Sequence, residues 1–288
     1  MAPSMRSSQA SSAWTGGTAP AISRPANRHH VQSRFIRRTI RHEAANRLPL
    51  TAATTTGSQA MSSERERQSL VATVDAHFRA TAADTGCSRL DDRVRQALLA
   101  VPRERFVPPS VHHLAYRDSP LPIGHEQTIS QPFIVALTVQ LLAPEAHHRV
   151  LDVGCGCGYQ AAVLAQLVDR VYGIELIAAL ADRARDTLRD LDIDRVSVRC
   201  GDGARGWPEE APFDGIAVAA AAHGVPDALP EQLRVGGRLV LPVEDERGWQ
   251  HLRLIERVAA DRWQQRDVLA VRFVPLITPT QPNQSGQV

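Results

Sequence analysis

The chain has 288 residues, of which 43% are hydrophobic and 22% charged, and this is the composition of an ordinary globular protein with a full hydrophobic core. The formal net charge is only +2, so the overall charge does not indicate a nucleic-acid-binding protein. No segment approaches the roughly 20 consecutive apolar residues of a membrane-spanning helix. We therefore expect no membrane association and no specific nucleic-acid partner.

Cysteine and histidine usage gives no indication of a metal site. The chain has four cysteines, which are Cys87, Cys155, Cys157 and Cys200. None belongs to a C-x-x-C pair of the kind that structural zinc sites use, which favours a reducing, cytoplasmic setting. Adjacent histidines occur at 112–113 and 147–148, but neighbouring residues do not share a helix face, so surface positions are favoured over metal ligands.

The first 60 residues differ in character from the rest. They are rich in Ser, Thr, Ala, Pro and Arg, contain Glu43 as their only acidic residue, and show no sustained periodicity. We expect a disordered extension over 1–60, a single domain over 61–283 and a short tail over 284–288. The extension also fits an organellar transit peptide or a translated upstream region before Met61.

Two amphipathic helices are expected before the core. Their apolar residues recur at helical spacing, as Leu70, Val74 and Phe78 in the first and Leu90, Val94 and Leu98 in the second. An exposed loop then leads to a third helix that ends at Leu142. Ser130 is a good N-cap for this helix, because Pro132 would then lie in its first turn.

Strands and helices alternate after residue 148. The expected strands are 149–153, 171–175, 196–199, 213–219 and 238–242, and the expected helices are 159–168, 176–191 and 229–233. Two further apolar runs, 251–254 and 268–274, are typical of an antiparallel pair. This order predicts an α/β fold with a Rossmann-like, doubly wound and mostly parallel sheet that ends in antiparallel strands.

A glycine-rich turn follows the first of these strands. Its sequence, DVGCGCG over 152–158, lets the backbone turn tightly and approach a ligand, while the next helix offers free N–H groups. Dinucleotide-binding turns have the spacing G-x-G-x-x-G, but Tyr159 stands where their third glycine belongs. The spacing therefore favours an adenosyl ligand without a pyrophosphate.

Two acidic residues end the strands beside this turn. Glu175 lies roughly 20 residues after the glycines, where a carboxylate can accept hydrogen bonds from both ribose hydroxyls. Asp202 follows the next strand with Gly203 and could bind the adenine amine. The alternatives are a solvated strand-end charge for Glu175 and an ordinary Asp-Gly turn for Asp202.

Several segments together resemble the protein-L-isoaspartate O-methyltransferase family of the bacterial type. They are QTISQP at 127–132, DVGCGCGYQAA at 152–162, GDG at 201–203, APFD at 211–214, AAA at 220–222, GGRLVLP at 236–242 and RFVPL at 272–276. The resemblance spans about residues 90–277 and is specific in order, spacing and content. It does not cover the first 60 residues.

The resemblance implies a class I methyltransferase fold that binds S-adenosyl-L-methionine and methylates isoaspartyl-containing peptides and proteins. We also expect a monomer. Ser130 matches the active-site serine of the family. The positions that match cofactor contacts are Thr128, Ile129, Ser130, Gly154, Cys155, Gly156, Gly158, Glu175, Asp202 and Gly203. The sequence departs from the family at Cys155 and Cys157, where small Ser, Thr or Gly residues are usual, and at Val135, where some members have His.

The chemistry implied by the resemblance needs positioning more than acid–base groups. A carboxylate is already ionised at neutral pH and a sulfonium methyl group is already electrophilic, so no general base is required. We expect Ser130 to orient the acceptor carboxylate as a hydrogen-bond donor, the alternative being a helix N-cap alone. Once methylated, the isoaspartyl ester can close to a succinimide without a second active site.

Two other functions remain open at this point. A class I methyltransferase acting on a small molecule or RNA would have the same glycine turn, Glu175 and Asp202. A catalytically silent binding module would use the fold without the reaction, with its Arg-rich extension contacting nucleic acid. The segment 128–132 and the region around Pro275 argue against the first, and an intact set of Ser130, Glu175 and Asp202 argues against the second.

Overall fold

The computed structural model describes residues 55–278, with side chains from residue 63 onward. Within that range no helix has the length and apolar character needed to cross a membrane. Most of the extension expected over 1–60 lies outside the described residues. Helix α1 (Thr55–Ala80) begins within the last six residues of that extension and continues through the apolar positions around Leu70.

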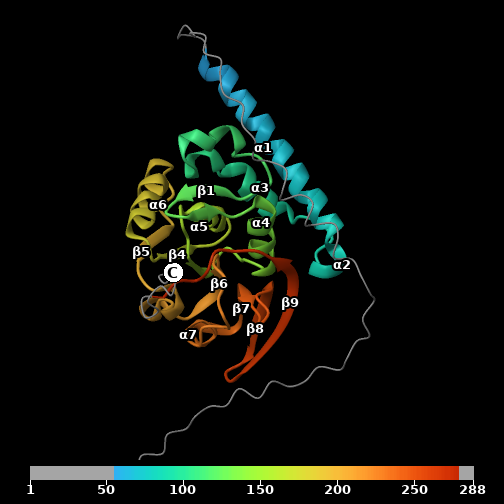
Figure 1. The fold of residues 1–288 in the computed structure, drawn as a ribbon, viewed down its shortest axis with the longest axis vertical. Coiled ribbons are helices and arrows are strands. Elements are labelled where there is room, and N and C mark those ends of the chain that lie inside the picture. The colour runs from blue at the N-terminus through green and yellow to red at the C-terminus, as the bar shows by residue number, and fades with distance from the viewer. Residues whose placement is uncertain (1–54, 279–288) are drawn as a thin grey trace, which may run out of the picture. The chain divides into compact units, whose positions relative to one another are not determined.

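A seven-stranded sheet forms the centre of the described chain (Figure 1). In spatial order its strands are β5 (Val196–Cys200), β4 (Arg170–Glu175), β3 (Arg149–Val153), β6 (Phe213–Val218), β7 (Leu233–Glu244), β8 (Gln250–Ala259) and β9 (Arg262–Val271). The pairs from β5 to β7 are parallel, and the pairs β7–β8 and β8–β9 are antiparallel. The expectation of a mostly parallel sheet with antiparallel C-terminal strands is confirmed.

The two faces of the sheet are covered differently, because successive residues of a strand point to opposite faces. Val150 packs into a core shared with the long helices, whereas its neighbour Leu151 packs into a second core. The second core lies under Trp207, Leu229 and other residues of short helical segments. Both faces of the central strands are therefore buried, as a doubly wound sheet requires.

The helices follow the sequence expectation in order and differ in length. They are α1, α2 (Ala82–Thr85), α3 (Asp92–Ala100), α4 (Pro132–Leu141), α5 (Tyr159–Ala165), α6 (Ala178–Asp190) and α7 (Ala228–Glu231), with short 3-10 turns at η1 (Arg103–Phe106), η2 (Pro109–Leu114), η3 (Gly203–Arg205) and η4 (Pro208–Glu210). Figure 1 shows α6 beside β5 and the group of α1, α3 and α4 on the other side of α5. Helix α1 contacts both α3 and α4.

Some boundaries differ from the sequence expectation. The antiparallel strands are longer than the apolar runs that predicted them, because the hairpin of β8 and β9 continues through polar residues as far as its turn at Ala260 and Asp261. A small hairpin of β1 (Leu121–Gly124) and β2 (Gln127–Ile129) occupies the segment that was expected to be an exposed loop. Its strands are too short to produce a readable alternation of apolar and polar residues.

The expectation that Ser130 caps the helix after this hairpin is wrong. Helix α4 begins at Pro132, so its N-cap position is Gln131, and no side chain at that position caps the helix. The N–H of Phe133 instead donates to Oδ1 of Asp118, at 2.8 Å. Asp118 comes from a bend well upstream, which sequence spacing cannot connect to the helix, and it leaves the Ser130 hydroxyl without a capping role.

Candidate active site

The glycine-rich turn connects β3 to α5 at the carboxyl edge of the parallel strands. Gly154, Gly156 and Gly158 have φ values of 70°, 54° and 87°, a region that side-chain-bearing residues rarely occupy. The N–H of Gly154 donates to the carbonyl of Ile174 in the adjacent strand, at 2.8 Å. The sequence therefore folds this segment into a tight turn whose backbone lies open to the edge of the sheet.

Glu175 ends β4 directly beside this turn. One of its carboxylate oxygens accepts the N–H of Gly156 at 2.9 Å, and the other accepts the N–H of Ile177 at the same distance. The residue is only 7% exposed, so it is not a solvated strand-end charge. Each carboxylate oxygen has a second lone pair, which leaves Glu175 able to accept hydrogen bonds from a ligand.

Asp202 and Gly203 follow β5 at the same edge. Oδ1 of Asp202 accepts the N–H of Ala204 at 3.0 Å, so this carboxylate caps the short helix η3. Gly203 lines the pocket described below, and a Cβ at that position would lie 2.5 Å from a methyl group of Val153. The sequence thus keeps residue 203 a glycine for close packing, while Asp202 itself is not among the residues that line the pocket.

On the opposite side of the turn, β2 leads Thr128, Ile129 and Ser130 to the edge of the same pocket. Ile129 is anchored in the core at 4% exposure, whereas Thr128 is exposed and Ser130 is partly exposed. No hydrogen bond or ion pair within the described range involves the Ser130 hydroxyl, which remains available to a ligand.

The far wall of the pocket comes from the segment after β9. Residues 274–277 line it, and the N–H of Leu276 donates to the carbonyl of Ala221 at 2.7 Å. The N–H of Ala221 in turn donates to the carbonyl of Val274 at 2.8 Å, so residues 274–276 run alongside the chain that follows β6. The sequence predicted no site role for these residues, although an apolar run that contains Pro275 after the last strand could have indicated one.

Together these segments line one open pocket. Eight of the ten residues with expected cofactor contacts line it, which are Thr128, Ile129, Ser130, Gly154, Cys155, Gly156, Glu175 and Gly203. The other two stand just outside. Gly158 packs instead against Ala184 and Leu188 of α6, and Asp202 precedes a lining residue.

Asp152 is buried beneath the glycine turn. Its side chain has 0% exposure, and burial together with the nearby charge of Glu175 raises the pKa of its carboxyl to about 7. Gln160 donates to Oδ1 at 2.7 Å, while Oδ2 has no hydrogen-bond partner among the residues that the structure describes. The carboxyl therefore changes its charge near neutral pH in a place that water does not reach.

Cys155 and Cys157 are free thiols whose side chains lie against the pocket. Burial raises the pKa of the Cys155 thiol well above its usual range and also raises the pKa of Cys157. Both are therefore neutral at pH 7. A neutral thiol is a weak hydrogen-bonding group, so these two residues act in the pocket mainly as small apolar side chains.

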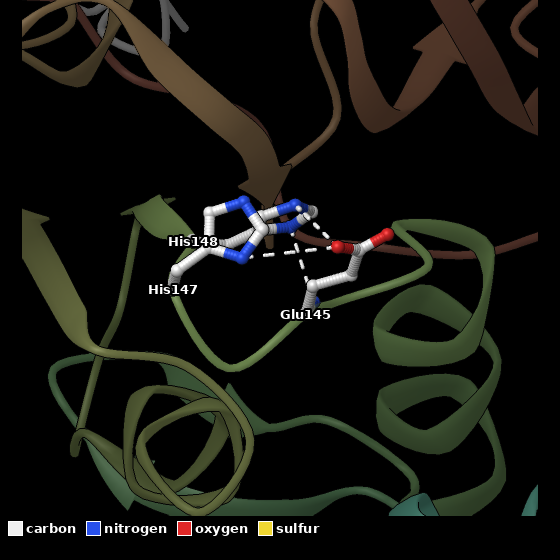
Figure 2. Close-up of side chains that lie close together, drawn as sticks. All are labelled: Glu145, His147 and His148. Atoms are coloured by element: carbon white, nitrogen blue, oxygen red, sulfur yellow. Dashed lines mark hydrogen bonds and ion pairs between the residues drawn. The ribbon is translucent and has the colours of Figure 1, made fainter.

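Glu145, His147 and His148 form a cluster between α4 and β3 (Figure 2), where each offers one ligand atom within 4.8 Å of the others. The expectation of surface positions is wrong for His148, which is 6% exposed.

The hydrogen bonds of His148 argue against a metal ion at this cluster. Its Nδ1 accepts the N–H of Glu145 at 3.1 Å. Burial lowers the pKa of His148, which keeps the ring neutral at pH 7. The guanidinium of Arg234 lies 3.1 Å from Nε2. A metal at Nε2 would have to displace this neighbouring cation.

Two solved structures with a similar fold are described as methyltransferases. One protein-L-isoaspartate O-methyltransferase is 28% identical with a TM-score of 0.63, over 73% of this chain and 65% of its own. A protein from Plasmodium falciparum described by the same activity, solved with S-adenosyl-L-homocysteine, is 25% identical with a TM-score of 0.61, over 73% of this chain and 98% of its own. The fold and the pocket at its carboxyl edge define a class I, S-adenosyl-L-methionine-dependent methyltransferase.

Sequence comparison places the chain within that class. The model of the family described as "Protein-L-isoaspartate(D-aspartate) O-methyltransferase (PCMT)" matches residues 82–281. Protein-L-isoaspartate O-methyltransferase 2 of Marinobacter nauticus is 52% identical over 65% of this chain and 85% of its own length. The protein of the same name from a Polaromonas species is 48% identical over 70% and 96%. The chain belongs to the protein-L-isoaspartate(D-aspartate) O-methyltransferase family.

Proposed function

We propose that this chain transfers a methyl group from S-adenosyl-L-methionine to the free α-carboxylate of L-isoaspartyl residues in damaged peptides and proteins. The observation that carries the proposal is one pocket that has a cofactor half and an acceptor half. One half is the glycine turn with Glu175, and the other is the segment 128–130 with its unengaged serine hydroxyl. The identity of the acceptor, an isoaspartyl carboxylate, is inferred from membership of the family.

The cofactor half fits an adenosyl group. Positive φ angles at the glycines hold backbone against the pocket, and Gly203, which lines the pocket, packs too closely against Val153 to carry a side chain. In this proposal Glu175 accepts hydrogen bonds from the ribose hydroxyls, and Oδ2 of Asp202, 3.8 Å from Nε of Arg205, accepts one from the adenine amine. We propose as cofactor-binding residues Thr128, Ile129, Ser130, Gly154, Cys155, Gly156, Gly158, Glu175, Asp202 and Gly203, with Gly158 acting through the shape of the turn.

The acceptor half needs a group that orients a carboxylate. Ser130 carries a hydroxyl with no other partner among residues 55–278 and lies at the pocket, so it is suited to donate one hydrogen bond to the acceptor. S-adenosyl-L-methionine supplies an electrophilic methyl group on a sulfonium. The acceptor is already ionised at neutral pH, so the role of the protein is alignment of the acceptor with the methyl group.

The product explains a repair role without a second site. Methylation turns the isoaspartyl α-carboxylate into an ester, and the next backbone nitrogen of the damaged protein attacks that ester with loss of methanol. The resulting succinimide hydrolyses in part to a normal aspartyl linkage. No residue of this chain is required for those later steps.

We also propose that the enzyme works as a monomer in the cytoplasm, without a specific nucleic-acid partner. One feature supports the cytoplasmic setting. All four cysteines are free thiols, as a reducing compartment requires.

The deciding experiment is methyl transfer from labelled cofactor to an isoaspartyl peptide and to its aspartyl twin of the same sequence. We expect label on the isoaspartyl peptide and almost none on the twin, because the longer main-chain path of the β-linkage moves the carboxylate. Equal labelling of both peptides, or of neither, would overturn the proposal. The Ser130→Ala variant reports in the same assay whether label depends on the acceptor half of the pocket.

A further inference from the structure

Asp118 lies in a bend between η2 and β1, and it binds the chain on both sides of the N-terminus of α4. Its Oδ1 accepts the N–H of Phe133 at 2.8 Å, and its Oδ2 accepts Nε2 of Gln131 at 3.0 Å. The Asp118 side chain is only 4% exposed. A single buried carboxylate thus holds the two residues that flank Pro132, directly after Ser130.

In this arrangement Asp118 caps α4, while the Ser130 hydroxyl stays free to bind a ligand. A residue at the N-cap normally uses its side chain to accept an N–H of the first helical turn. Gln131 occupies the N-cap of α4 without doing so, and Ser130 stands one residue further back. Because Asp118 accepts the N–H of Phe133 in their place, the serine hydroxyl is left free for the pocket.

The buried charge of Asp118 has partners of its own. Nδ1 of His77, on α1, lies 2.5 Å from Oδ2 of Asp118, and the His77 ring packs edge-on against the ring of Phe133. Arg103, buried over the ring of Tyr159, donates to the carbonyl of Ser119 at 3.2 Å. Asp118 is therefore held by His77 of α1, the next residue is held by Arg103 of η1, and the carboxylate does not rotate freely at the surface.

We propose that Asp118 is a positioning residue for methyl transfer, which fixes the backbone around Ser130 so that the serine hydroxyl meets the acceptor carboxylate. This inference rests on the proposed function of Ser130. Asp118 itself need not touch substrate or cofactor, since it is not among the residues that line the pocket. Its effect should therefore appear in the rate of transfer and disappear when the Ser130 hydroxyl is absent.

The test is a double-mutant cycle of Asp118→Ala and Ser130→Ala in the full chain, with labelled S-adenosyl-L-methionine and the isoaspartyl peptide. We expect Asp118→Ala to lower kcat by about 10- to 100-fold, the effect of misplacing a reacting group by about 1 Å. The KM for S-adenosyl-L-methionine should stay within about twofold, because the cofactor half is untouched. In the Ser130→Ala background, the same substitution should lower kcat by less than about twofold.

Two further variants separate positioning from general stability. Asp118→Asn keeps an oxygen that can accept the N–H of Phe133 and should recover most of the lost kcat. Asp91→Ala is the matched control, because Asp91 caps α3 by accepting the N–H groups of Arg93 and Val94 and lies away from the pocket. It should lower Tm to a similar extent as Asp118→Ala and leave kcat unchanged.

Two results would overturn the inference. One is an equal loss of kcat from Asp118→Ala in both backgrounds, and the other is a wild-type kcat in a folded Asp118→Ala protein. Failure of the proposed function would be recognised separately, because the wild-type enzyme would then not label the isoaspartyl peptide.

Discussion

The carboxylate of Glu175 accepts the backbone N–H of Gly156, at a distance of 2.9 Å, and so joins the end of one strand to the glycine turn that follows its neighbour. Its other oxygen accepts the N–H of Ile177, at the approach to α6. The residue that we propose as the ribose ligand is thus also part of the framework of the turn. Its substitution should have consequences for both binding and stability.

Glu175→Ala is expected to weaken binding of S-adenosyl-L-methionine by roughly 1.5–3 kcal/mol, the range for hydrogen bonds to a charged group. It should also lower the free energy of unfolding by about 1–3 kcal/mol, since two backbone N–H groups lose their acceptor. Calorimetric titration and urea unfolding measure the two effects, and Glu175→Gln, which keeps one acceptor oxygen, should lie between. Unchanged cofactor affinity in a folded Glu175→Ala protein would contradict the assignment.

Ser130→Ala is expected to slow methyl transfer by about 10- to 1000-fold while cofactor affinity changes little, because the substitution removes only an orienting hydrogen bond. Its Tm should stay close to that of the wild type, since Asp118 and not Ser130 caps α4. Single-turnover rates and thermal unfolding provide both measurements. A serine nucleophile would instead give a methylated Ser130 and no turnover in the variant, so mass spectrometry of the enzyme under turnover is the control.

Gly203→Ala should damage the cofactor half by crowding. The added Cβ would lie 2.5 Å from a methyl group of Val153, and relief of that overlap must shift η3 or β3. We expect a loss of about 1–3 kcal/mol in the free energy of unfolding, typical of overpacking. Gly201→Ala is the matched control, because its Cβ would have no neighbour nearer than 3.9 Å. Equal stability of the two variants would show that the packing around Gly203 is loose.

Asp152 should make stability depend on pH in an unusual direction for a carboxylate. Its folded pKa of about 7 exceeds the ordinary value of 3.8, so between these values the folded protein holds a proton that the unfolded chain releases. The contribution of Asp152 is therefore favourable at low pH and is lost as pH rises through this window, with a slope of about 1.4 kcal/mol per pH unit.

Asp152→Asn removes this titration while leaving an oxygen for the Gln160 side chain to donate to. Urea unfolding at a series of pH values from 4 to 8 should give a flatter profile for the variant than for the wild type. Equal pH slopes for the variant and the wild type would mean that the Asp152 carboxyl has the same pKa in the folded and the unfolded state.

The sequence predicted the parts of the site that lie within one segment and could not predict those that depend on distant segments. The glycine turn and Glu175 are separated by one βα unit, and parallel strands bring their carboxyl ends to one edge, so their meeting followed from the fold. The cap of α4 depends on Asp118, and nothing in local spacing distinguishes it from a surface aspartate. Local spacing therefore predicted Ser130 as the cap of α4, whereas in the structure Asp118 accepts the N–H of Phe133 in the first turn.

The pocket wall at residues 274–277 is the last part of the described chain to be synthesised, yet it lies alongside Ala221 and faces the glycine turn. A chain in which β3 to β6 have formed but β7 to β9 have not docked has the glycine turn and lacks this wall. Ligand binding stabilises only those states in which the binding site is complete. S-adenosyl-L-methionine should therefore select the fully folded enzyme over its partly folded intermediates, and its binding would report the completion of folding.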